Sequence, residues 1–315
     1  MADALSPGLS ATARVPASSA NLGAGFDSLA VALAIYDEVT ATVTEGGLRV
    51  EVVGEDADIV AQDESHLVVR AIRRGLAVRG MAAPGLVVQC RNAVPHARGL
   101  GSSATAIVAG LAAAQALVAK SEGAEELLDQ AELVQLGSEF EGHPDNASAS
   151  VLGGAVVSWT ETEAEAEAEG GPARFRAAPV QVSPQVVPVV FIPQSRGLTH
   201  ISRGVLPELV PRGDAVTNLS RSALMVLALG SDPDLLFPAS EDRLHQPHRA
   251  AEQPETAELV RALRDRGVAA MVSGAGPSVL ALTSREAHRA ACAEVLAGTG
   301  WERREISFAQ AAKAW

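Results

Sequence analysis

The stretch PHARGLGSSAT, residues 95–105, decides the fold expected for this chain. It joins GLVVQCRNAVP (85–95) to an alanine-rich run (104–120), an order that predicts a strand, a glycine loop and a helix. Glycines at 99 and 101 let the backbone approach a ligand, while the first amides of the helix stay unpaired. Such a helix start is typical of an anion site. The alternative is a plain cap, with the hydroxyl of Ser102 or Ser103 bound to a helix amide.

The loop lacks lysine, and this separates it from the common nucleotide loops. The sequence contains neither the GxxxxGK[ST] pattern of a Walker A loop nor the HRD and DFG motifs of a protein kinase. The helix N-terminus supplies roughly half a positive charge, and Arg98 adds one more at most, so a nucleoside triphosphate would remain poorly neutralised. We therefore expect a magnesium ion, held by oxygen ligands such as a serine hydroxyl and a carboxylate.

Composition places the chain among globular proteins and argues against several classes of partner. It has 315 residues, 47% of them apolar, and a net charge of −13 without a basic stripe, so no nucleic-acid partner is expected. The apolar run 104–119 would span about 24 Å as a helix, short of a hydrocarbon core of roughly 30 Å. We expect a buried core helix and no membrane partner. Cys90 and Cys292 form no CxxC or Cys/His cluster, which favours a reducing, cytoplasmic location.

Local patterns predict an α+β chain. Residues 39–54, VTATVTEGGLRVEVVG, alternate around an EGG turn and predict a hairpin, and Ser65 is a candidate N-cap for a helix over 65–79. The acidic run ETEAEAEAEGGPA (161–173) predicts a solvated loop between two domains. Residues 268–283 predict a strand, a glycine turn and a second strand. We place the N-terminal domain at 1–160 and the C-terminal domain at 161–315.

PHARGLGSSAT resembles the PxxxGLGSSA phosphate loop of the GHMP small-molecule kinases. VPASSANLGAGFDSLAVAL (15–33) and VSGAGPSVLAL (272–282) resemble the N-terminal and C-terminal motifs of that family, in the same order along the chain. Other segments resemble the homoserine kinase branch of the family, namely SANLGAGFD (19–27), EGHPDNASASVLGG (141–154), SRGVLP (202–207) and HQPHR (245–249).

The resemblance implies a two-domain α+β fold, with an N-terminal domain of ribosomal-protein-like βαβ topology and a ferredoxin-like C-terminal domain. It implies ATP-dependent phosphorylation of the hydroxyl of L-homoserine to O-phospho-L-homoserine, with Mg²⁺ as a further cofactor. Two alternatives stay open: a kinase of the same family that acts on mevalonate or a sugar, and a noncatalytic binding protein with this fold. A homodimer is also left open.

The resemblance assigns the nucleotide and metal sites residue by residue. Ser103 and Glu141 match the metal-binding hydroxyl and carboxylate. Pro95, His96, Ala97, Arg98, Gly99, Leu100, Gly101, Ser102, Ser103, Ala104 and Thr105 form the phosphate loop.

The acceptor site follows from the same comparison. Asp27 would hold the substrate ammonium and Asn21 would lie near the acceptor hydroxyl, although NLGAGFD could instead be only a turn with side-chain-to-backbone hydrogen bonds. Asp145 matches a position proposed as general base in mevalonate kinases, whereas homoserine kinases are thought to work by positioning and electrostatics. His143, Asn146 and Gly276 match other substrate-side positions.

Two arginines match the positions that bind the substrate carboxylate, namely Arg203 and Arg249. An arginine suits this task because its planar guanidinium can bind both carboxylate oxygens. Arg196 and Arg243 are close to them in the sequence and remain alternatives for the same role.

Overall fold

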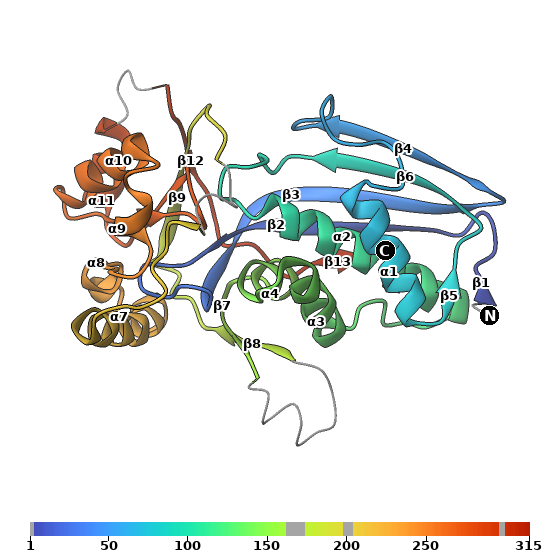
Figure 1. Cartoon of the computed structure of the whole chain (residues 1–315), viewed down its shortest axis with the longest axis horizontal. Helices are drawn as coiled ribbons and strands as arrows, with labels where there is room; N and C mark the ends of the chain where they lie inside the picture. Colours follow the sequence, from blue (N-terminus) through green and yellow to red (C-terminus); the bar gives the residue numbers. More distant parts are fainter. Residues whose placement is uncertain (1–2, 162–173, 198–203, 296–299) are drawn as a thin grey trace.

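The computed structural model describes residues 3–161, 174–197, 204–295 and 300–315, which form two domains, each built on a β-sheet (Figure 1). The larger sheet runs β13-β2-β3-β6-β4, and β7 and β8 extend it from β3. Its strands are β2 (Ser10–Ala20), β3 (Leu29–Thr44), β4 (Gly47–Gly54), β6 (Gly85–Asn92), β7 (Ala155–Thr160), β8 (Phe175–Val180) and β13 (Lys313–Ala314). A small separate pair joins β1 (Asp3–Ala4) and β5 (Met81–Ala82).

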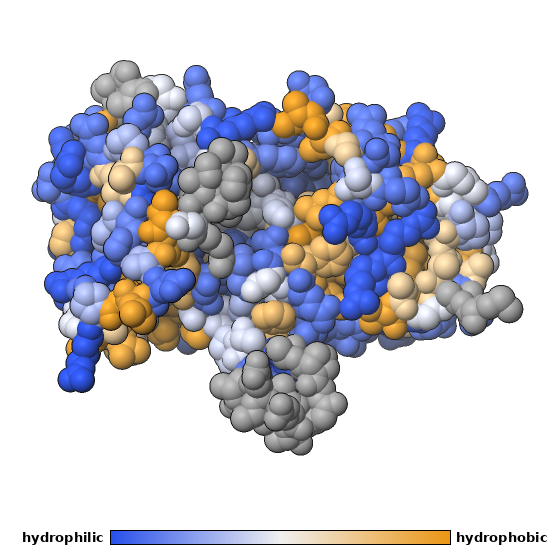
Figure 2. All heavy atoms as spheres, viewed as in Figure 1, coloured by the Kyte–Doolittle hydropathy of each residue, from blue (hydrophilic) through white to orange (hydrophobic). Residues whose placement is uncertain are grey.

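Among the described residues, four helices pack against this sheet: α1 (Leu67–Val78), α2 (Ser102–Glu122), α3 (Gln130–Glu141) and α4 (Asp145–Leu152) (Figure 1). α2 is apolar enough and long enough to cross a membrane, yet 83% of its apolar window is buried inside the protein. The prediction of a core helix at 104–119 is therefore confirmed. On the face shown in Figure 2, hydrophilic residues predominate and hydrophobic ones form separate patches.

The hairpin predicted for residues 39–54 is wrong. β6 lies between β3 and β4, antiparallel to the first and parallel to the second, and α1 makes the crossover from β4 to β6. Gly85, at the start of β6, packs against the EGG turn so closely that a Cβ there would lie 2.4 Å from the Gly46 carbonyl carbon. The alternating pattern located both strands, but a third strand from further along the chain decides their pairing.

The cap predicted at Ser65 is also wrong, by one residue. Asp63 Oδ1 accepts hydrogen bonds from both the backbone N–H and the hydroxyl of Ser65. His66 is the N-cap instead, and its Nδ1 accepts from the Val68 N–H. An imidazole nitrogen can therefore do the work of the hydroxyl that the sequence pattern favoured.

The smaller sheet has the order β10-β11-β9-β12 and is antiparallel. Two helices cover one face, where Leu263 of α10 and Cys292 of α11 pack with Phe191. α7 and α8 cover the other face, in a core shared with Leu22 and Leu33 of the first domain. This is the ferredoxin-like arrangement that was predicted. The elements are β9 (Val187–Ile192), α7 (Arg212–Gly230), a 3₁₀ turn (Pro233–Leu235), α8 (Leu236–Ala239), α9 (Gln246–Arg249), α10 (Pro254–Arg264), β10 (Ala269–Val272), β11 (Val279–Thr283), α11 (Glu286–Glu294) and β12 (Glu302–Glu305).

The chain passes between the domains more than once. β8 follows residue 160 in sequence yet pairs with β7 in the larger sheet, and β13 at the far C-terminus pairs with β2. The division between residues 160 and 161 stays a prediction, and most of the acidic loop lies outside the described residues. The C-terminal segment thus ties the second domain back to the first.

Candidate active site

A cavity of about 540 Å³ lies where the three glycine-containing motifs meet. The N-terminal motif contributes Asn21, the phosphate loop and the start of α2 contribute one wall, and the second glycine turn contributes Gly274 and Ala275. The remaining lining residues are Ala97, Gly99, Gly101, Ser102, Ser103, Phe140, Glu141, His143, Asn146 and Arg249. Segments more than 250 residues apart thus converge on one site, as the backbone bond from Gly274 N–H to Ala20 O illustrates.

The phosphate loop ends at an uncapped helix start. The N-cap of α2 is Gly101, in the left-handed conformation with φ of 67°, and no side chain among the described residues caps the helix. The alternative of a plain serine cap is therefore wrong. Gly101 has a second reason to be glycine, because a Cβ there would lie 2.0 Å from Ser18 Oγ. The start of α2 is thus available to an anion, as the sequence indicated.

Arg98 has a different role from the one its position suggested. Its guanidinium donates to the carbonyls of Pro193 at 3.0 Å, Gln194 at 3.1 Å and His96 at 3.2 Å. Arg98 therefore fastens the phosphate loop to the strand end after β9. Its side chain does not line the cavity, so it adds less to phosphate neutralisation than its place in the loop implied.

Asp37 holds the segment that leads into the phosphate loop. Its Oδ1 accepts from the backbone N–H groups of Ala93 at 2.7 Å and Val94 at 2.9 Å. Burial raises the pKa of Asp37 to about 6, although these two hydrogen bonds oppose the shift. The Asp37 carboxyl group therefore binds its proton more tightly in the folded protein than in the unfolded chain. Ionisation of Asp37 therefore lowers the free energy of unfolding, and this loss grows as the pH rises from about 4 to about 6.

Asp37→Asn is expected to raise the free energy of unfolding at pH 7.5 by up to about 3 kcal/mol, since one pKa unit corresponds to about 1.4 kcal/mol. The amide oxygen can keep both backbone hydrogen bonds while the buried charge is removed. Urea titrations between pH 4 and pH 8 measure the effect, and the variant should also lose part of the pH dependence. Glu38→Gln, at the adjacent half-exposed position of β3, is the control. A less stable Asp37→Asn protein at pH 7.5 would contradict this account.

Ser103 and Glu141 meet at the start of α2. Glu141 is the last residue of α3, and Ser103 Oγ donates to its Oε1 at 2.7 Å. Both side chains line the cavity and are reachable from solvent. A hydroxyl and a carboxylate oxygen at this spacing form a hard-oxygen donor pair that suits Mg²⁺, which usually completes its shell with water and substrate phosphates.

Asn21 and Asp27 frame a loop with left-handed residues at both ends, with φ of 59° and 51°. Asn21 Oδ1 accepts from the Asp27 N–H at 2.9 Å, and its Nδ2 donates to the Gly274 carbonyl at 3.2 Å. The side-chain-to-backbone turn weighed as an alternative is therefore present, and Asn21 lines the cavity as well. The two interpretations are compatible, because the turn is what places the amide in the site.

A second group of candidate residues lies at the start of α4. His143 Nδ1 is 2.6 Å from Asp145 Oδ1, which also accepts from the Asn146 N–H. Asp145 is fully buried, and its Oδ2 has no hydrogen-bond partner among the described residues. His143 and Asn146 line the cavity while Asp145 lies beneath them. Asp27, His143 and Asp145 offer ligand atoms within 4.8 Å of one another, a cluster suited to a cation.

The four arginines considered for carboxylate binding fall in different places. Arg249 on α9 is only 2% exposed and lines the cavity. Arg196 is paired with Asp56 and Arg243 with Asp214, and neither lines the cavity. Arg203 lies outside the described residues. Among the described arginines, the geometry singles out Arg249.

The second glycine turn packs directly on the phosphate loop. A Cβ on Gly99 would lie 2.2 Å from the Ser273 carbonyl oxygen, and Ser273 Oγ donates to the Gly99 carbonyl at 2.6 Å. Gly276 has φ of 82° and contacts Gln253 rather than the cavity itself. The sequence did not single out Ser273 or Ser18 as site residues. The Ser18 hydroxyl donates to Asn146 Oδ1 at 2.9 Å. Their signal was modest, because each is a small hydroxyl residue near the end of a strand, and only Ser273 is next to a glycine.

Comparison with known proteins agrees with this site and fold. Residues 66–154 match the family model described as the GHMP kinases N terminal domain, and residues 224–300 match the GHMP kinases C terminal model. The chain belongs to the GHMP kinase family.

Named relatives of similar sequence point to one branch of this family. The chain is 53% identical to the homoserine kinase of Mycolicibacterium smegmatis, over 98% of this chain and 95% of that one. It is 58% identical to the homoserine kinase of Rhodococcus erythropolis, over 88% of this chain and 87% of that one. The crystal structure of homoserine kinase from Cytophaga hutchinsonii matches with a TM-score of 0.81 at 24% identity, covering 98% of each chain, and supports the two-domain fold.

Proposed function

We propose that this protein is a homoserine kinase, which transfers the γ-phosphoryl group of ATP to the hydroxyl of L-homoserine and forms O-phospho-L-homoserine. The observation that carries the proposal is the single cavity in which an uncapped helix start, an oxygen donor pair and a buried arginine converge. The identity of over 50% to homoserine kinases along nearly the whole chain supports the same substrate.

The residues that line the cavity include two sets, each suited to one substrate. The glycine backbone and the start of α2 would bind the phosphates of ATP. Ser103 and Glu141 would hold Mg²⁺, which would supply the positive charge that the lysine-free loop lacks. Phosphoryl transfer passes through a loose transition state, so alignment and charge neutralisation contribute most of the catalysis.

The acceptor amino acid would lie against Asn21, His143, Asn146 and Arg249. The Arg249 guanidinium would bind its carboxylate, and the carboxyl groups of Asp27 and Asp145 beside His143 would attract its ammonium. Asp145 accepts hydrogen bonds that orient His143 and the first turn of α4. This burial beneath the lining residues supports a positioning role for Asp145 rather than proton abstraction.

We also propose a cytoplasmic location, where the substrates of an ATP-dependent biosynthetic step are available. Cys90 and Cys292 are both free and buried, as suits a reducing compartment.

The proposal is tested by ADP release with L-homoserine, mevalonate, galactose or no acceptor, each with Mg²⁺ and with EDTA. Of the three acceptors, we expect only L-homoserine to raise the rate of ADP release, by at least about tenfold over the acceptor-free rate. EDTA should abolish this increase. Mass spectrometry should identify the phosphorylated product. An increase with mevalonate or galactose but not with homoserine would reassign the substrate, and no increase with any acceptor would favour a binding protein.

A further inference from the structure

Arg249 is hydrogen-bonded to His245, the first residue of the HQPHR motif, to which the sequence assigned no role. One guanidinium nitrogen, Nη1, donates to the Gly274 carbonyl and lies 3.1 Å from His245 Nδ1. A guanidinium can only donate hydrogen bonds, so Nδ1 must offer its lone pair. His245 thus acts as an acceptor for Arg249, next to the second glycine turn.

The other ring nitrogen fixes the protonation state of His245. Nε2 lies 2.8 Å from the Gly23 carbonyl oxygen, which can only accept, so Nε2 carries the hydrogen. The imidazole is therefore neutral and in one tautomer. Burial lowers the pKa of His245, the Arg249 guanidinium acts in the same direction, and Asp242 opposes them. A second proton on Nδ1 would point directly at a donor.

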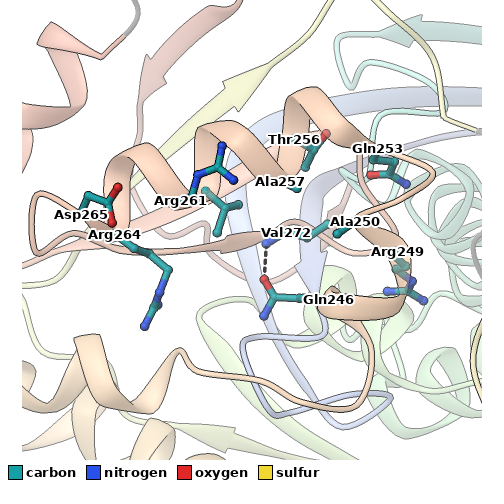
Figure 3. Close-up of a pocket in the computed structure, with 11 residues that line it drawn as sticks. Gln246, Arg249, Ala250, Gln253, Thr256, Ala257, Arg261, Arg264, Asp265 and Val272 are labelled. Carbon is teal, nitrogen blue, oxygen red and sulfur yellow. Dashed lines mark hydrogen bonds between the residues drawn. The ribbon is translucent and has the colours of Figure 1, made fainter.

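The surroundings leave the imidazole little freedom to turn. Asp242 accepts from the backbone N–H groups of Leu244, His245 and Gln246 and from Asn218 Nδ2, which fixes the turn that begins α9. Gln246 Oε1 accepts from the Val272 N–H and fastens α9 to β10, as Figure 3 shows. On its remaining side the ring lies 5.5 Å from the ring of Phe26.

A neutral partner has a specific advantage at this position. A carboxylate beside Arg249 would pair with the guanidinium and compete with an incoming carboxylate. The Asp242 carboxylate is turned toward backbone amides, and its Oδ2 lies 3.5 Å from His245 Nε2, the ring nitrogen that does not face Arg249. The imidazole therefore orients the guanidinium through a hydrogen bond and adds no negative charge of its own beside it.

We propose that His245 is a positioning residue that selects for acceptors with a carboxylate, by fixing the orientation of Arg249. It also couples Arg249 to the loop from Asn21 to Asp27 through the Gly23 carbonyl. This inference rests on the proposed function, because it takes the Arg249 guanidinium to be the site of the acceptor carboxylate.

Two substitutions separate the two ring nitrogens. In His245→Asn the amide oxygen replaces Nδ1 and can still accept from Arg249, whereas in His245→Gln the longer side chain reaches the place of Nε2 and loses that acceptor. Steady-state kinetics are measured with L-homoserine and with 3-aminopropan-1-ol, which keeps the amine and the hydroxyl but lacks the carboxylate. The ratio of the two kcat/KM values is the carboxylate preference.

We expect His245→Gln to lower the carboxylate preference by about 10- to 100-fold, the effect of one hydrogen bond to a buried charged group. His245→Asn should keep the preference within about threefold. The KM for ATP should stay unchanged in both variants. A purely structural role would instead lower kcat/KM for both acceptors together, and that result would overturn the proposal.

The remaining outcomes are also decisive. Wild-type turnover of L-homoserine in the same assay tests the proposed function separately, and its absence would remove both proposals. If His245→Gln does not fold, the folded His245→Asn protein decides: a preserved preference supports the positioning role, and a lost preference with a normal KM for ATP overturns it.

Discussion

Glu141→Gln is expected to lower kcat with L-homoserine by about 10²–10³-fold, the usual effect of removing one group that stabilises charge in the transition state. The amide keeps the shape of the side chain and can still accept the Ser103 hydrogen bond, so the fold should not change. It is a poor ligand for Mg²⁺, because that ion prefers charged carboxylate oxygens. The Mg²⁺ concentration for half-maximal rate should therefore rise together with the loss of kcat.

Glu139→Gln is the matched control for this experiment. Glu139 lies on the same helix, two residues earlier, and pairs with Arg74 on the surface. Its replacement should leave both kcat and the Mg²⁺ requirement within about twofold of wild type, since exposed ion pairs contribute little. If Glu141→Gln kept the wild-type Mg²⁺ requirement, the metal would have to be held elsewhere, and the cluster of Asp27, His143 and Asp145 would be the next candidate.

Sequence reasoning succeeded where the determinants are local or belong to a motif. The glycine loop followed by an alanine-rich helix predicted α2 and its open N-terminus, because glycine conformation and apolar composition are properties of neighbouring residues. The meeting of Ser103 with Glu141 was predicted from the family resemblance alone. No local pattern could have shown it, because the two residues belong to different helices and are 38 positions apart.

Sequence reasoning failed where packing partners decide the outcome. The residues around the EGG turn have the pattern of a hairpin. In the structure, however, β6 lies between β3 and β4 and pairs with both, so these two strands do not pair with each other. Arg98 belongs to the phosphate loop in sequence, yet carbonyls of the second domain bind its guanidinium. His245 looked like part of a short motif around Arg249, and only the three-dimensional contact with Gly23 reveals its tautomer and its place in the site.

Gly99→Ala is expected to lower kcat/KM for ATP by about 100-fold or more, because misplacement of reacting groups by about 1 Å can cost this much. Gly99 has φ of +71°, and a Cβ there would meet two backbone oxygens of the second glycine turn, Ser273 O at 2.2 Å and Gly276 O at 2.9 Å. These oxygens belong to a turn held by backbone hydrogen bonds, so the phosphate loop and the turn must move apart.

Gly123→Ala isolates the contribution of contact from that of backbone conformation. Gly123 is the C-cap of α2, the helix that follows the phosphate loop. Its φ is +70°, but a Cβ there would meet nothing within 4 Å. Its replacement should cost about 1–2 kcal/mol of unfolding free energy from the left-handed conformation alone and leave kcat/KM near wild type. Because the two substitutions share the conformational cost, the difference between them measures the contact between the loop and the second glycine turn. Equal kinetic constants for the two variants would mean that this contact does not position the phosphates.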